Sequence, residues 1–220
     1  EKSVVKKLEK LNPKGKKFNN LTSDKIAIII GIEKYEKAPL ATFAAADAKF
    51  FHEYARLVFG VPKENIKLLI DEKASRIDTL AVLNKWLPAK INKNKTELII
   101  FFAGHGLANT KGNINDLYIL SQNSDPDMLA ESAISRSKFF KKILDLEPKN
   151  ITMFIDACYS GVSRDEKTLL ASARPLRLNS DEQNRIPENF TIFSASQLDQ
   201  ISSGLKEAKH GIFSYYLMKG

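Results

Sequence analysis

The stretch "LIIFFAGHG", residues 98–106, joins an unbroken apolar run to a histidine that stands between two glycines. Consecutive apolar side chains over 98–102 are typical of a strand buried on both faces, as strands are in parallel sheets covered by helices. Gly104 and Gly106 have no Cβ, so the backbone can turn tightly or lie close to another group there. His105 is therefore expected at the end of a buried strand, where a side chain that titrates near neutral pH can serve as a general base. From this stretch alone, a histidine that only completes a turn is an equal alternative.

The segment "ITMFIDACYSG" around Cys158 repeats this architecture, because an apolar run again ends in polar residues and a glycine. Two buried parallel strands would bring His105 and Cys158 to the same edge of a sheet, where open α/β sheets bind their ligands. A thiol at its reference pKa of about 8.5 is mostly protonated at neutral pH, so a neighbouring histidine is needed to take its proton. A buried structural thiol is the alternative, but the polar neighbours Asp156, Tyr159 and Ser160 favour a nucleophile.

Apolar runs of strand length alternate with segments of helical periodicity along most of the chain. Strands are expected over residues 24–32, 65–70, 96–104, 116–120, 150–157 and 189–196. Helices are expected over 42–60, 75–87 and 135–146, the second closed by Pro88, with a last helix starting near 210. This alternation predicts an α/β fold with a mainly parallel central sheet flanked by helices.

Composition limits the possible classes of function. With 220 residues, 43% of them apolar, the chain can bury the core of one domain or at most two. No apolar run approaches the roughly 18 to 20 residues of a membrane helix, so we expect a soluble protein, with the cytoplasm favoured, and no membrane partner. A single cysteine excludes an internal disulfide framework and a multi-cysteine zinc site. The oligomeric state is left open.

The net charge of +8 is concentrated at the start of the chain. Residues 1–20 hold seven lysines and two glutamates, which contribute +5 of that charge. This distribution is more typical of a solvated basic leader than of a nucleic-acid surface, and no nucleic-acid-binding motif follows it. We therefore expect no nucleic-acid partner, and binding through the leader is the least favoured alternative.

The motifs "FFAGHG" and "IDACYSG", with the cysteine 53 residues after the histidine, resemble those of the caspase and metacaspase superfamily of cysteine peptidases. Four further segments resemble other parts of the proteins in that family: "KIAIIIGIEKY", "AAADA", "SASQLDQISSG" and "HGIFSYYLMKG". The animal cysteine signature, with Gln and Arg around the thiol, is absent, so the bacterial metacaspase-like members are the better match. The resemblance implies the caspase-hemoglobinase fold and a thiol protease.

The resemblance covers about residues 25–220 and implies an organisation of the chain. A basic leader or linker over 1–24 precedes the peptidase domain. Within the domain we expect a large-subunit-like part over 25–160, a processing or lid loop over 161–188 and a truncated small-subunit-like part over 189–220.

The loop 161–188 is polar and longer than loops usually are in a compact domain. Caspase-like enzymes often mature by cleavage after the cysteine strand, so its basic residues are candidate self-cleavage sites: Arg164, Lys167, Arg174, Arg177 and Arg185. An ordered lid formed around "RPLRL" is the alternative.

The resemblance also assigns the catalytic roles. It implies that His105 is the general base and Cys158 the nucleophile of an endopeptidase that works through an acyl-enzyme thioester. The backbone N–H groups of Gly106 and Cys158 would form the oxyanion hole. No cofactor is required by such a dyad.

Substrate specificity is expected to differ from that of animal caspases. They have Gln two residues before the cysteine, whereas this chain has Asp156, and Asp47 in "AAADA" matches a second acidic position of metacaspases. Two carboxylates imply a substrate with Arg or Lys before the scissile bond. Ser194 and Ser196 are further substrate-binding candidates from the resembling segment. For Asp47, an exposed acid on a helix surface is the alternative, and specificity for Asp is the alternative for the enzyme.

Calcium is the one metal that the resemblance raises, because many metacaspases bind it outside the active site. The segment "NSDPD" supplies Asp125 and Asp127 as candidate ligands. Two acids in a turn are more often solvated turn residues than part of a six- to eight-oxygen site, so we do not expect calcium to be required. A different class of function also stays open, namely a caspase-like scaffold or binding module whose dyad is idle.

Overall fold

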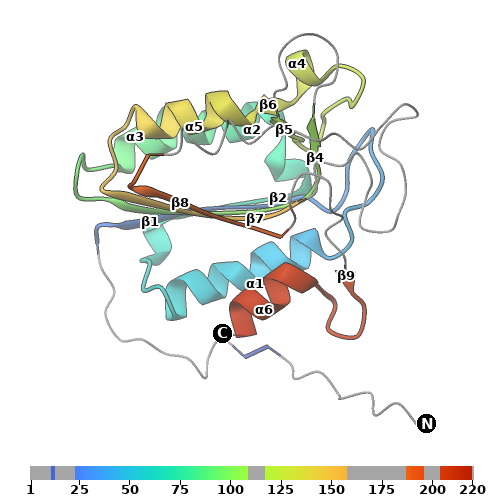
Figure 1. Ribbon diagram of the computed structural model, residues 1–220, viewed down its shortest axis with the longest axis horizontal. Helices are drawn as coiled ribbons and strands as arrows, with labels where there is room; N and C mark the ends of the chain where they lie inside the picture. The colour runs from blue at the N-terminus through green and yellow to red at the C-terminus, as the bar shows by residue number, and fades with distance from the viewer. Residues whose placement is uncertain (1–10, 13–22, 109–116, 158–186, 196–203, 220) are drawn as a thin grey trace.

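A computed structural model of the chain describes residues 11–12, 23–108, 117–157, 187–195 and 204–219. Its centre is a five-stranded sheet that lies between two layers of helices (Figure 1). The strands are β1 (Lys25–Gly31), β2 (Ile66–Ile70), β3 (Glu97–Ala103), β7 (Asn150–Asp156) and β8 (Phe190–Ser194). All neighbours in the order β2-β1-β3-β7-β8 are parallel, which confirms the expected α/β fold.

The unbroken apolar runs follow from burial on both faces of this sheet. Side chains alternate between the two faces along a strand. In β1, Ile26, Ile28 and Ile30 pack into one core cluster, while Ala27 and Ile29 pack into the other. In an amphipathic strand every second residue would be polar. In β1 both faces pack into an apolar core, so neither face accommodates a polar side chain.

Each helical layer fills one of these two cores (Figure 1). One face of the sheet is covered by α1 (Ala44–Leu57) and α6 (Ile212–Lys219). The other face is covered by α2 (Arg76–Ala81), the π-helical turn η4 (Val82–Trp86), α3 (Leu87–Lys90) and α5 (Arg136–Leu144).

The expectation that Pro88 closes the second helix is wrong, since helical structure continues to Lys90. The turn before the proline is π-helical, and the N–H of Leu87 bonds to the carbonyl oxygen of Val82, five residues back. This wider turn changes the hydrogen-bond pattern where the proline has no N–H to donate, so its ring is accommodated.

Smaller elements complete the described part of the chain. An antiparallel sheet contains β4 (Gly106–Ala108), β5 (Leu117–Ile119) and β6 (Ile134–Ser135), and β9 (Gly204–Leu205) pairs with β10 (His210–Gly211). The short helices are η2 (Lys63–Asn65), η3 (Asp71–Ala74) and α4 (Leu129–Ser132). Among the described helices, none has the length and apolar character needed to span a bilayer.

The strand order creates a switch point beside β1. The chain passes from β1 to β2 on one side and later returns to place β3 on the other side of β1. Connections that leave the carboxyl ends of β1 and β3 therefore run in opposite directions, and such a point is where open α/β sheets form a crevice. The loop after β1 and the motif after β3 both lie there.

Candidate active site

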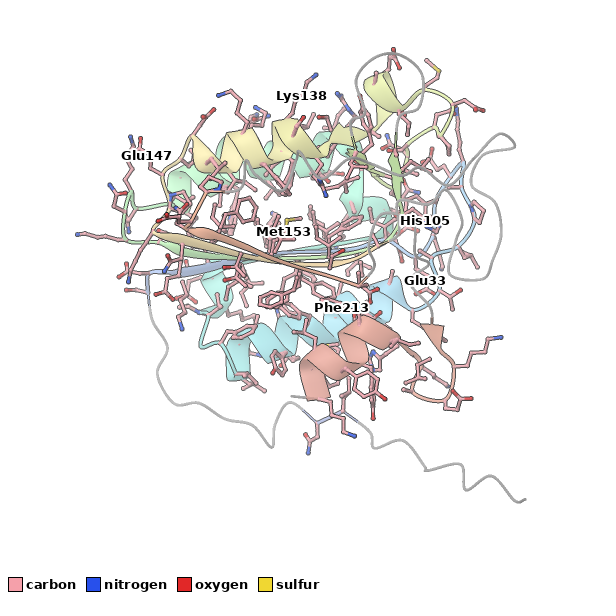
Figure 2. All side chains as sticks on the ribbon, in the orientation of Figure 1. Glu33, His105, Lys138, Glu147, Met153 and Phe213 are labelled. Atoms are coloured by element: carbon pink, nitrogen blue, oxygen red, sulfur yellow. The ribbon has the colours of Figure 1, made fainter. Side chains whose placement is uncertain are left out.

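His105 lies just beyond the carboxyl end of β3 and is 3% exposed. Figure 2 shows it at the same end of the sheet as Glu33, opposite the end that carries Glu147. Its carbonyl oxygen accepts a hydrogen bond from the N–H of Leu120, at 3.0 Å, which joins the central sheet to the small antiparallel sheet. His105 is thus fixed at the end of a strand, where the central sheet meets the small antiparallel sheet.

Two residues of the loop after β1 hold His105 directly. The backbone N–H of His105 donates to the hydroxyl of Tyr35 at 2.8 Å, and the imidazole Nε2 lies 2.9 Å from the carbonyl oxygen of Pro39. The rings of Tyr35 and His105 also pack together, with centroids 4.9 Å apart. A carbonyl oxygen can only accept, so Nε2 carries a proton in this contact. In the neutral imidazole, Nδ1 is then the nitrogen that can act as a base.

Gly104 is required by this arrangement. A Cβ at this position would lie 2.5 Å from the Tyr35 hydroxyl oxygen and 3.0 Å from the ring of Phe102. The first glycine of the "GHG" motif therefore makes room for the tyrosine that holds the histidine. Gly106, the second, opens β4 opposite Ile119.

Asp156 is the last residue of β7 and is fully buried. Its Oδ2 accepts hydrogen bonds from the hydroxyl of Ser214, at 2.5 Å, and from the N–H of Ser214, at 3.3 Å. Ser214 stands in the first turn of α6. The described surroundings of Asp156 are thus set by the C-terminal helix.

Asp47 lies in the first turn of α1 and is also fully buried. Its Oδ1 is 2.6 Å from Nδ1 of His210, and its Oδ2 accepts from the N–H of Gly211 at 3.0 Å. The alternative of an exposed acid on a helix surface is therefore wrong. Both carboxylates converge on the start of α6, where the helix dipole favours negative charge.

Sequence reasoning missed four of these groups: the Tyr35 hydroxyl, the Pro39 carbonyl, His210 and Ser214. Tyr35 stands in "KIAIIIGIEKY" and His210 in "HGIFSYYLMKG", but neither segment gives a reason to pair its polar residue with a particular partner.

The remaining candidates divide between described and undescribed segments. Ser194 ends β8 and is exposed. Cys158, Ser196 and the five basic residues of the loop lie outside the described residues, as does most of the basic leader.

The calcium candidates Asp125 and Asp127 lie in an exposed turn. Asp125 Oδ2 is 2.8 Å from Lys37 Nζ, and its Oδ1 accepts from the N–H of Asp127 at 3.0 Å. The hydrogen bond from Lys37 holds the pKa of Asp125 below its usual value. Within the segments that the structure describes, no three His, Cys, Asp or Glu residues gather as a metal site.

A parallel α/β sheet that fixes a histidine beside its switch point defines a class of α/β proteins that bind their ligands at the carboxyl ends of the strands. More specifically, the chain belongs to the caspase domain family (Peptidase_C14), whose family model matches residues 24–220. This is a family of cysteine peptidases.

The fold also occurs in the crystal structure of protein GSU0716 from Geobacter sulfurreducens. That structure is similar with a TM-score of 0.65 and 15% sequence identity, over 89% of this chain and 81% of the other. At this identity the likeness shows the fold alone. No curated protein sequence matches the chain.

Proposed function

We propose that this protein is a cysteine endopeptidase in which His105 and Cys158 form the catalytic dyad. The observation that carries the proposal is the register of β3 and β7, in which Ala103 lies opposite Asp156. His105 and Cys158 each follow by two residues in the sequence, so their separation of 53 residues equals the offset of the two strands. Neighbouring strands are about 4.8 Å apart, a distance that suits proton transfer between side chains at matched positions.

The chemistry follows from these positions. Nδ1 of His105 takes the proton of the Cys158 thiol, and the thiolate attacks the scissile carbonyl carbon, so that a C–S bond forms. The backbone N–H groups of Gly106 and Cys158 stabilise the oxyanion. When the C–N bond breaks, the imidazolium gives its proton to the leaving amine, and a thioester remains. Water, deprotonated by His105, then attacks the thioester carbon; the C–S bond breaks, the new carboxyl terminus is released, and the imidazolium returns the proton to the sulfur of Cys158.

In each half-reaction His105 takes up a proton and then gives it away, so it is ready for the next half-reaction. This cycle therefore requires no metal or cofactor. Calcium is accordingly not part of the proposal. The Pro39 carbonyl has a role in it, because accepting a hydrogen bond from Nε2–H keeps Nδ1 as the basic nitrogen and stabilises the imidazolium that forms.

We further propose that the preferred residue before the scissile bond is Arg or Lys. Asp47 and Asp156 are desolvated carboxylates close to the carboxyl end of the sheet, and a guanidinium is the natural counterion of such groups. A carboxylate has about four acceptor positions, so the hydrogen bonds from His210, Gly211 and Ser214 are compatible with a further bond to substrate. Ser194 and Ser196 are proposed to contribute polar contacts beside this pocket.

Cleavage-site profiling on a random peptide library tests the function and the specificity together. The expected result is cleavage after Arg and Lys that is absent in Cys158→Ala, with stoichiometric labelling of the wild type by a thiol-directed covalent probe on an Arg peptide. Cleavage after Asp would contradict the acidic pocket but would still support the proposed peptidase activity. Absence of both cleavage and labelling would favour the idle scaffold module.

A further inference from the structure

The loop Glu33–Ala41, between β1 and α1, is a closed unit. The N–H of Ala41 donates to the carbonyl oxygen of Glu33 at 2.9 Å, so the two ends of the loop are joined. Loops of this kind, with adjacent ends, pack as compact bodies. The nine residues can therefore act as one rigid piece.

Besides its contacts with His105, this loop is joined to Asp71, Gln122 and Asp125. Oδ1 of Asp71 accepts from the N–H groups of Glu33, at 2.8 Å, and Lys34, at 3.0 Å. The N–H of Glu36 donates to the carbonyl oxygen of Gln122 at 3.1 Å. The third contact is the exposed ion pair between Lys37 and Asp125. Of the three, only Asp71 binds two consecutive N–H groups of the loop with one oxygen.

Asp71 stands at a conformationally unusual position. It follows β2 directly and has φ 45°, in the left-handed region that few side chains adopt. Asp and Asn tolerate this region better than most residues because their short polar side chains form local hydrogen bonds. Because Ile70 lies opposite Gly31, the carboxylate of Asp71 is next to the start of the loop that follows β1.

The same loop makes two of the contacts that fix His105. Tyr35 binds its backbone N–H and packs on its ring, and Pro39 binds Nε2. One contact sets the position of the main chain, and the other sets the orientation of the imidazole. A loop that moved as a unit would disturb both together.

We propose that Tyr35 is a positioning residue for His105, and that Asp71 anchors the loop through which Tyr35 and the Pro39 carbonyl act. This inference rests on the proposed function in one respect, that His105 is the catalytic base. Neither Tyr35 nor Asp71 exchanges protons with substrate. Their role is to keep Nδ1 as the basic nitrogen and to hold it in place.

The first test compares Tyr35→Phe with Tyr54→Phe. Both variants lose one hydroxyl and keep the ring, but Tyr54 lies in the aromatic cluster on α1, away from His105. Tyr35→Phe is expected to lower kcat about tenfold with KM changed less than about twofold, because small misplacements of a catalytic group are costly. Tyr54→Phe is expected to keep the wild-type kcat.

The second test uses the anchor. Asp71→Ala removes the acceptor, whereas Asp71→Asn keeps an oxygen that can accept the two N–H groups. A positioning role predicts a loss in kcat of about tenfold for Asp71→Ala and recovery to within about threefold of wild type for Asp71→Asn. Equal kcat in wild type and Asp71→Ala would overturn the anchor.

A readout independent of activity is the tautomer of His105, measured by 1H–15N NMR of the imidazoles in the full chain. The chain has three histidines, and His105→Gln identifies the relevant signal. We expect the Nε2–H form in the wild type and a mixture of tautomers in Tyr35→Phe and Asp71→Ala. If these shifts occur in a protein without peptidase activity, the proposed function fails and the positioning stands. If an active enzyme shows neither the shifts nor the loss in kcat, the positioning is wrong and the function stands.

Discussion

The ends of β3 and β7 lie side by side in the sheet, yet the residues that bind His105 and Asp156 there come from opposite parts of the chain. His105, after β3, is held by Tyr35 and Pro39, which precede it by 70 and 66 residues. Asp156, at the end of β7, is held by Ser214, which follows it by 58 residues. Asp47 likewise binds His210 and Gly211.

The difference teaches that the base and the acidic residues can be disturbed independently. The described hydrogen-bond partners of His105 are neutral groups of Tyr35, Pro39 and Leu120. Those of the Asp47 and Asp156 carboxylates belong to β10 and to the first turn of α6. Orientation of the base should therefore survive changes in α6, while the surroundings of the two carboxylates should not.

The largest effect is expected from removing the dyad itself. Cys158→Ala and His105→Ala should each lower kcat/KM by at least about a thousandfold, because neither half-reaction proceeds without both groups. Circular dichroism should show the wild-type fold, since both residues stand beyond the packed apolar runs. Turnover retained in purified Cys158→Ala would contradict the proposed mechanism.

A second pair of variants compares a glycine at the site, Gly104, with a glycine in the scaffold, Gly31. Gly104→Ala places a methyl group 2.5 Å from the Tyr35 hydroxyl oxygen, so kcat should fall at least about tenfold. Gly31→Ala places one 2.4 Å from the Cβ of Ala48, against the backbone of α1, so the free energy of unfolding should fall by about 1 to 3 kcal/mol.

The double variant of Gly104→Ala with Tyr35→Phe sharpens this test. It removes the oxygen that the new methyl group meets, so it should be more active than Gly104→Ala alone. A double variant whose kcat is lower than that of either single variant would show that the clash is not the cause.

A third contrast addresses the acidic side. Asp156→Asn should lower kcat/KM on Arg substrates at least about tenfold, since truncating one partner of a desolvated charge pair costs about 2 to 5 kcal/mol. On substrates with an uncharged residue before the scissile bond it should change little. Ser214→Ala should instead lower stability by about 2 kcal/mol, through its lost hydrogen bond to the carboxylate, and leave the preference for Arg unchanged. Equal effects on both substrates in Asp156→Asn would mean that the carboxylate only anchors α6.

Processing of the loop 161–188 is expected to be an activity of the enzyme on itself. Incubated alone, the wild type should give one fragment of about 18 to 21 kDa and one of about 4 to 6 kDa, according to the site used, with new ends after Arg or Lys, and remain one folded unit. Mass spectrometry of the fragments identifies the sites among the five basic candidates. Identical cutting in Cys158→Ala would identify a contaminating protease, and an active wild type that stays intact would favour the lid.

The smallest effect is expected at the exposed anchor of the loop. The hydrogen bond from Lys37 lowers the pKa of Asp125 from its usual 3.8 in the folded state. Its stabilisation is therefore present above that pH and is lost as the pH falls through the lowered pKa. Lys37→Met should lower Tm slightly near neutral pH, by an amount that decreases as the pH falls below 3.8, whereas Lys34→Met, from the same loop, should have no pH-dependent effect. A Tm difference that does not decrease in acid would contradict this account.

The sequence by itself determined the layers of the fold and one half of the site. Unbroken runs such as Ile26–Ile30 and Leu98–Phe102 are typical of strands buried on both faces, because every side chain of such a strand lies in an apolar core. Glycines after those runs place His105 at a strand end. Local periodicity was misleading at Pro88, because a π-helical turn alters the hydrogen bonds that a proline normally breaks.

Only the tertiary structure decided which groups surround the candidate residues. Periodicity records which face of an element is buried, but it carries no information on strand order or register, and these bring residues far apart in sequence together. The placement of β3 next to β1 puts Tyr35 and Pro39 against His105. The docking of α6 beside α1 buries Asp47 on His210, 163 residues away, which no local pattern could reveal.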